Sequence, residues 1–120
     1  MKLICKTCNL EISKPISELN DLSLINENDR QDFVPEGFYL AFHDGTAYAK
    51  LIKDSIIINK KDLVNSIYHS EQSRLNGCCG QDGLDGINRV CINNHEIGTE
   101  KSDCWMPHYV ALNPGLVKFI

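Results

Sequence analysis

Hydrophobic and polar positions alternate most regularly in the middle of the chain, where they predict paired β-strands. Residues 37–43 place large apolar side chains at every second position, which is the pattern of a half-buried strand. Asp44 and Gly45 then suit the positive φ angles of a two-residue hairpin turn, and residues 46–53 are expected to return antiparallel. The three consecutive isoleucines within residues 55–58 predict a further strand that is buried on both faces.

A helix is predicted from residue 60 to residue 75. Leu63, Ile67 and Leu75 recur at helical spacing, so this stripe is expected to pack onto the sheet. Asn59 precedes the stripe, and its side-chain oxygen can accept hydrogen bonds from the N–H groups of the first turn. This segment is the one main helix of the predicted fold.

Shorter apolar runs near both ends of the chain predict the remaining strands. Residues 1–8 read as a strand that enters a turn, and residues 9–12 can return beside it as a small hairpin. Together, the elements predict an α+β fold: an antiparallel sheet centred on residues 37–53, with one main helix packed on it. Further strands are expected at residues 89–92, 96–99 and 109–112, and residues 116–120 form a final apolar run.

The composition is that of an ordinary globular domain and predicts a single domain over residues 1–120. Hydrophobic residues make up 42% and charged residues 23%, which argues against disorder. The formal net charge of −4 argues against a dedicated nucleic-acid-binding protein, because such proteins carry a basic stripe. No apolar run is long enough for a signal peptide or a membrane-spanning helix. We therefore expect a cytoplasmic protein that has no membrane association and keeps its cysteines reduced.

Cysteines add candidate chemistry to this picture. Cys5 and Cys8 form a Cys-x-x-Cys turn that can present two thiolates to one Zn²⁺, which takes such ligands in tetrahedral geometry. In a reducing compartment, cysteines in this pattern are metal ligands more often than disulfides. The other four cysteines crowd into the last third of the chain: Cys78, Cys79, Cys91 and Cys104.

The Cys5 to Cys8 turn and the C-terminal cysteines together resemble the two knuckles of a zinc ribbon. The resemblance implies a small, bacterial-type protein in which a structural Zn²⁺ staples the N-terminal turn to a cysteine-rich lobe. The chain departs from the zinc-ribbon pattern, because adjacent Cys78 and Cys79 stand in place of a second Cys-x-x-Cys turn.

Four thiols are predicted to bind one Zn²⁺. Cys79 is chosen over Cys78 because adjacent side chains of an extended segment point in opposite directions. Gly80 also gives the backbone after Cys79 more freedom to turn its amides toward a thiolate. The predicted ligand set is Cys5, Cys8, Cys79 and Cys91.

Other ligand sets stay open at this point. Cys78 or Cys104 can replace one of the chosen cysteines. His95 and His108 each follow a cysteine by four residues, so either can complete a Cys3His site. Otherwise both histidines are interpreted as surface or turn residues.

Two other kinds of site are disfavoured. The Cys-x-x-Cys turn lacks the following helix that lowers the thiol pKa in thioredoxin-like redox motifs. Asp82, Asp85 and Asn88 lie in a glycine-rich loop but match no EF-hand pattern. Turn formation therefore explains these three residues better than calcium binding.

The leading functional hypothesis is a non-enzymatic binding module with a structural zinc and another protein as its partner. The acidic segment at residues 17–32 can steer the chain toward a basic partner, as in toxin-neutralising immunity proteins. One alternative is an enzyme that uses zinc or the Cys104 thiol, with His108 as a candidate base. The other is a zinc-ribbon-like nucleic-acid-binding protein, favoured only by a local group of lysines: Lys50, Lys53, Lys60 and Lys61.

Overall fold

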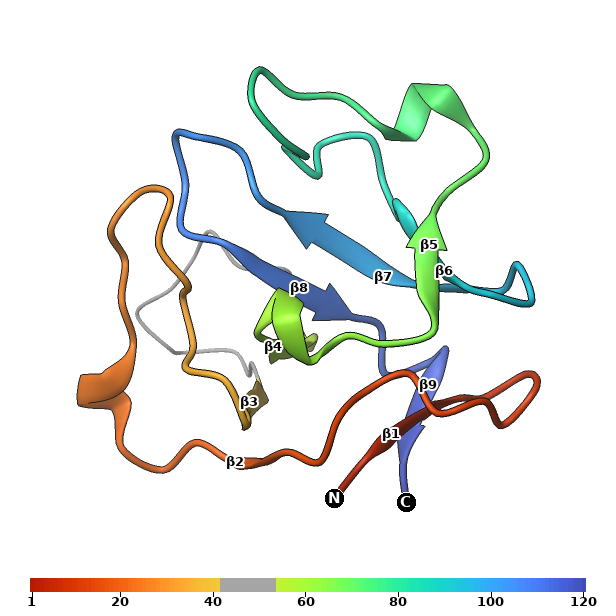
Figure 1. Ribbon diagram of the computed structural model, residues 1–120, viewed down its shortest axis with the longest axis horizontal. Helices are drawn as coiled ribbons and strands as arrows, with labels where there is room; N and C mark the ends of the chain where they lie inside the picture. Colours follow the sequence, from red (N-terminus) through yellow and green to blue (C-terminus); the bar gives the residue numbers. More distant parts are fainter. Residues whose placement is uncertain (42–53) are drawn as a thin grey trace.

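The computed structural model describes residues 1–41 and 54–120, and these residues form a fold that is nearly all β-sheet (Figure 1). Among them, 33% of residues are in strands, 8% are helical, and no helix reaches seven residues. The predicted α+β fold with one main helix is therefore wrong.

Seven strands form the main sheet, in the spatial order β2-β3-β4-β8-β7-β6-β5. Neighbouring strands are antiparallel, except that β2 runs parallel to β3. The strands predicted in the last third of the chain are confirmed as β6, β7 and β8. The bounds are β2 (Ser17–Glu18), β3 (Phe38–Ala41), β4 (Ile56–Ile58), β5 (Ser66–Tyr68), β6 (Arg89–Cys91), β7 (Glu96–Lys101) and β8 (Tyr109–Leu112).

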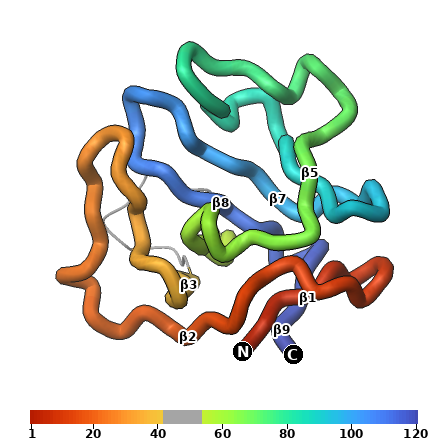
Figure 2. Tube along the Cα trace, viewed as in Figure 1, coloured from red at the N-terminus to blue at the C-terminus, as the bar shows by residue number. Residues whose placement is uncertain are grey.

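A separate two-stranded sheet joins the two ends of the chain. β1 (Leu3–Cys5) pairs antiparallel with β9 (Val117–Phe119), so that the two ends lie side by side (Figure 2). β9 falls within the final apolar run at residues 116–120. The short 3-10 helices are η1 (Leu22–Leu24), η2 (Lys60–Asp62) and η3 (Gln72–Arg74).

Both faces of the central strands are buried, which confirms the prediction for residues 55–58. In β4, Ile56 and Ile58 lie in one hydrophobic core, whereas Ile57 lies in another. The first core consists of Leu3, Cys5, Ile12, Ile16, Tyr39, Ile56, Ile58, Cys91, Ile97, Val110, Leu112 and Val117. The second core consists of Leu19, Phe33, Val34, Ile57, Tyr109 and Ala111. Two of the cysteines are thus part of the first core.

The hairpin predicted at residues 37–53 is described only in part. Its first strand is present as β3, whereas residues 42–53, with the Asp44-Gly45 turn, lie outside the described residues. Along its described length β3 pairs with β4, and Leu40 lies opposite Ile57. The middle strand of the described sheet is β8, so the sheet is not centred on β3.

The helix predicted at residues 60–75 is wrong. This segment contains η2, β5 and η3 instead. Asn65 has a φ of 51°, which is incompatible with a right-handed helix. Beyond it, Ile67 pairs with Val90 of β6 and is 49% exposed, so Ile67 does not face a core, whereas Leu63 packs against the first core. Strand pairing with a distant segment has overridden the local helical spacing.

Asn59 does cap the start of this segment, as predicted, although the helix that it caps is only the short η2. Its side-chain oxygen accepts a hydrogen bond from the Lys61 N–H at 2.8 Å. Its amide donates to the Val34 carbonyl at 3.0 Å, and the side chain is fully buried. Asn59 therefore ties η2 to the segment that supplies the second core.

Replacing Asn59 with alanine is expected to lower the free energy of unfolding by about 1–3 kcal/mol, because the cap is lost and a buried carbonyl loses its donor. Urea unfolding would measure the change. Asn59→Ser is the matched control: it keeps a capping oxygen and should recover part of the loss. An Asn59→Ala variant as stable as the unchanged protein would contradict this role.

Candidate metal centre

The first half of the candidate site is the turn after β1. Cys5 is the last residue of β1, and the chain reverses at Asn9, whose φ is 62°. The Asn9 N–H donates to the Cys5 carbonyl at 2.8 Å, and the Cys5 N–H donates to the Leu10 carbonyl at 2.9 Å. Residues 9–12 thus return beside β1, with Ile4 opposite Glu11, as the sequence predicts. This hairpin holds Cys5 and Cys8 in one tight loop.

The second half is the turn between β6 and β7. Cys91 ends β6, and His95 directly precedes β7. Asn94 has a φ of 67°, a left-handed conformation that asparagine tolerates. Its N–H donates to the Cys91 carbonyl, and the Cys91 N–H donates to the His95 carbonyl, both at 2.8 Å. The tight turn therefore places Cys91 and His95 at the base of one hairpin tip.

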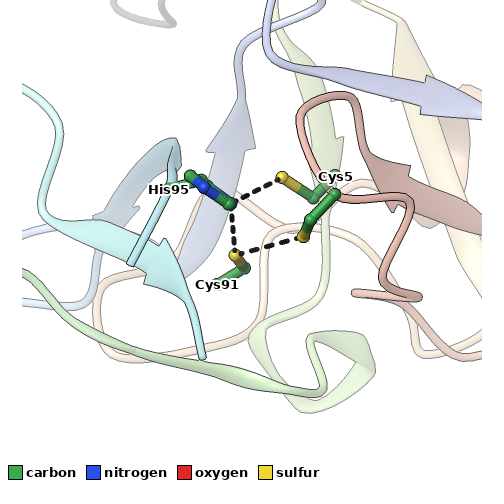
Figure 3. A group of neighbouring side chains, drawn as sticks. Cys5, Cys91 and His95 are labelled. Carbon is green, nitrogen blue, oxygen red and sulfur yellow. Dashed lines mark hydrogen bonds between the residues drawn. The ribbon is translucent and has the colours of Figure 1, made fainter. Parts of the chain in front are cut away.

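The two hairpin tips meet, and their four donor atoms lie within 4.8 Å of one another (Figure 3). Nδ1 of His95 is 3.8 Å from Sγ of Cys5 and 3.5 Å from Sγ of Cys91. The Sγ atoms of Cys8 and Cys91 are 3.9 Å apart. Tetrahedral zinc with Zn–S of about 2.3 Å separates sulfurs by about 3.8 Å and sulfur from nitrogen by about 3.6 Å. These three distances match such a site, so the group can hold a metal ion.

Burial and hydrogen bonding set the charge state of the thiols. Cys5 and Cys91 are buried in the first core, whereas Cys8 and His95 are half-buried. The Asn93 amide donates a hydrogen bond to Sγ of Cys8 at 3.4 Å. This bond has the largest effect on the pKa of Cys8 and a bond with the Leu10 backbone the next largest, and the pKa is lowered to about 6. Burial raises the pKa of Cys91. Because the thiolate is the form that binds metal, the site holds one thiol ready to ionise and one that must release its proton.

The structure brings three of the four predicted ligands together and separates the fourth. Cys5, Cys8 and Cys91 share this group with His95, which the sequence left open as an alternative. Cys79 lies in a different group, and His108 lies in neither group. The sequence feature that indicates His95 as a member of this group is the Asn-Asn turn between it and Cys91, because residues that flank a tight turn meet in space.

A second group of thiols consists of Cys78, Cys79 and Cys104, whose sulfur atoms also lie within 4.8 Å of one another. Cys78 and Cys79 are exposed, and their sulfurs are 3.9 Å apart. Hydrogen bonding with the Cys79 thiol, together with burial, raises the pKa of Cys104 to about 11. This group too can hold a metal ion.

The glycine-rich loop between these groups is held by its own hydrogen bonds. Asp82 accepts a bond from the Leu84 N–H at 2.9 Å, and Asp85 accepts one from the Asn76 amide at 2.7 Å. Asn88 is buried and exchanges two hydrogen bonds with the backbone of Glu100. The bond at Asp82 and the turn at Asp85 support the interpretation of these two residues as turn-forming, whereas Asn88 instead fastens the end of the loop to β7.

No protein-family model, curated protein or solved structure matches this chain. The resemblance to zinc ribbons therefore has no family match behind it. Two groups of side chains can each hold a metal ion. The first is Cys5, Cys8, Cys91 and His95, and the second is Cys78, Cys79 and Cys104. In the described part of the chain, every helix is too short or too polar to span a membrane.

Proposed function

We propose that this chain is a small zinc protein in which Cys5, Cys8, Cys91 and His95 bind one structural Zn²⁺. The observation that carries the proposal is the meeting of two hairpin tips that are distant in sequence. Cys5 and His95 are 90 residues apart, yet their donor atoms lie 3.8 Å from each other. His95 takes the place of Cys79 in the ligand set.

The donor set and its surroundings favour a structural role for the metal. Three thiolates and one imidazole complete a tetrahedral zinc site, which leaves no open position for a substrate or an activated water. Cys5 and Cys91 are also part of the first core, so the ion would lie directly beside the packed interior. Zinc here would join two loops rather than perform chemistry.

The chain would then act as a non-enzymatic binding module, one domain over residues 1–120, in a reducing compartment such as the cytoplasm. Such a compartment keeps cysteines reduced, and a reduced thiol can ionise to the thiolate that binds a metal. Asp21, Glu27 and Asp29 are exposed and offer an acidic surface to a basic protein partner. The same surface chemistry suits a toxin-neutralising protein.

The lysines that the structure describes do not favour the alternative function, nucleic-acid binding. Lys61 is engaged with Asp32, with 3.3 Å between Nζ and the carboxylate oxygen. Nζ of Lys60 lies 3.4 Å from Nδ1 of His108. Lys50 and Lys53 lie outside the described residues. The described pair thus does not form the unpaired basic stripe that phosphate binding needs.

Zinc content and ligand identity test this proposal. We would use a Cys78→Ser, Cys104→Ser background to remove the second group, and measure zinc by elemental analysis and X-ray absorption. The expected result is one Zn²⁺ per chain with three sulfur ligands and one nitrogen ligand. Adding Cys79→Ser should leave this spectrum unchanged, whereas adding His95→Ala should remove the nitrogen ligand or the metal. A spectrum with four sulfurs that changes with Cys79→Ser would overturn the proposed ligand set.

A further inference from the structure

We propose that Cys78, Cys79 and Cys104 form a second metal site, an open three-thiolate site that takes a soft ion such as Zn²⁺ or Cd²⁺ from solvent. The proposal uses none of the side chains of the structural site. It rests on the closeness of the three sulfurs, on the carboxylate that orders their backbone, and on the exposure of Cys78 and Cys79.

The three thiols converge although two of them are neighbours in sequence. In an extended segment, adjacent side chains point in opposite directions. Residues 78–80 form a bend instead, and this bend leaves the sulfurs of Cys78 and Cys79 3.9 Å apart. Cys104 joins them from the far side of the loop. The separation fits two thiolates on one tetrahedral or trigonal ion.

Asp103 holds both segments in this arrangement. It is 1% exposed, and its carboxylate accepts hydrogen bonds from the backbone N–H groups of Cys78, Cys79 and Cys104 at 3.0, 2.9 and 2.7 Å. The indole of Trp105 donates a fourth bond to it at 3.0 Å. One carboxylate thus orders the backbone of all three cysteines before any metal binds.

Close backbone contact keeps the loop against this carboxylate. A side chain on Gly80 would begin 2.2 Å from the Ser102 carbonyl oxygen, and one on Gly77 would begin 1.7 Å from the Gly80 carbonyl oxygen. The Ser102 N–H also donates to the Gln81 carbonyl at 2.8 Å. Only glycine fits at these two positions, so the sequence is suited to bring the thiols together.

The donor set defines the kind of ion and the kind of binding. Thiolates select soft ions such as Zn²⁺, Cd²⁺ and Cu⁺ over Mg²⁺ or Ca²⁺. The group has three donors among the described residues, because the Asp103 carboxylate is occupied by N–H groups and faces the backbone. Cys78 and Cys79 are exposed, so a fourth position is open to solvent. Such an ion would exchange faster than one enclosed by four protein ligands.

Cadmium titration of the full chain under reducing conditions tests the second site. Thiolate-to-cadmium charge-transfer absorption gives the stoichiometry, and cadmium NMR separates the two coordination environments. The expected result is two Cd²⁺ per chain, of which a competing chelator removes one first. Cys78→Ser, at an exposed position, should abolish that weaker equivalent and leave the tighter one unchanged. Cys8→Ser should have the opposite effect.

The remaining outcomes would rule out either the second site or the structural zinc site. A single equivalent in the unchanged protein that survives Cys78→Ser, or a disulfide among these three cysteines in protein kept reduced, would overturn the second site. If Cys8→Ser removes nothing while Cys78→Ser removes one equivalent, the proposed structural zinc site is wrong and the second site stands.

Asp103 provides a separate test as a positioning residue. Asp103→Asn keeps the size of the side chain but replaces one acceptor oxygen with an amide. The expected loss of cadmium affinity at the second site is about 10- to 100-fold, the range for outer-shell partners of metal ligands. The cadmium NMR signal of the structural site should not move, which distinguishes this effect from general unfolding. Unchanged affinity at the second site would show that Asp103 does not organise it.

Discussion

Removing zinc is expected to destabilise the whole sheet rather than one loop. The proposed ligands come from two turns, with Cys8 and Cys91 83 residues apart in the sequence, and Cys5 and Cys91 are also part of the first core. A ligand that binds only the folded state stabilises it by about 4 kcal/mol when its free concentration is a thousand times Kd. Thermal unfolding before and after chelation should therefore show a single transition at a clearly lower temperature without metal.

Matched cysteine variants separate loss of metal from loss of a side chain. Cys8→Ser should match the chelated protein in melting temperature and gain nothing from added zinc. Cys78→Ser should keep the large gain from zinc that Cys8→Ser loses, because Cys78 belongs to the other group of thiols. Zinc affinity should also weaken as the pH falls, because protons compete for the thiolates and imidazole that bind the ion. If chelation leaves the melting temperature unmoved, the structural role of zinc is wrong.

Truncating Ile58 to alanine is expected to cost about 2–5 kcal/mol of unfolding free energy, the range for a large aliphatic side chain removed from a packed core. Ile58 is fully buried in β4, between β3 and β8. Its removal leaves a cavity that the flanking strands cannot close without losing their register.

Ile67 is the matched control, because it is also an isoleucine in a strand but lies on β5 at the edge of the sheet and is 49% exposed. Ile67→Ala should change the unfolding free energy by no more than about 1 kcal/mol, since little apolar surface loses its packing there. Urea unfolding of both variants gives the comparison. Similar losses at the two positions would place Ile67 in a core and contradict the described sheet.

Strands with strong local patterns could be predicted from the sequence. The isoleucine run of β4 and the apolar run of β8 predict buried strands, because β-branched residues pack well on a pleated surface. The helix predicted at residues 60–75 is wrong because the local spacing of Leu63, Ile67 and Leu75 does not reveal the distant strand, β6, with which this segment pairs. Ile67 pairs with Val90, more than twenty positions further along, and local spacing carries no information about that pairing.

In the candidate site too, local features could be predicted from the sequence and the meeting of distant segments could not. Cys5 and Cys8 could be predicted, because a Cys-x-x-Cys turn is a local feature with a known preference for metal. The choice between Cys79 and His95 could not, because it depends on which hairpin tip meets the N-terminal turn. The rule that separated Cys78 from Cys79 assumed extended backbone, and the buried carboxylate of Asp103 instead orders a bend there.

The antiparallel pair of β1 and β9 also has a mechanical consequence. Force applied to the two chain ends would open the pair one step at a time, first at the bond from the Ile120 N–H to the Lys2 carbonyl and then at Leu3 and Phe119. The pair of Ile4 and Lys118 opens next, and the fourth step reaches Cys5, opposite Val117. With zinc bound as proposed, a metal–thiolate bond at Cys5 would resist further opening, together with the hydrogen bond from the Lys6 N–H to the Leu116 carbonyl. The ion would then raise the force needed to extend the chain beyond this pair of strands.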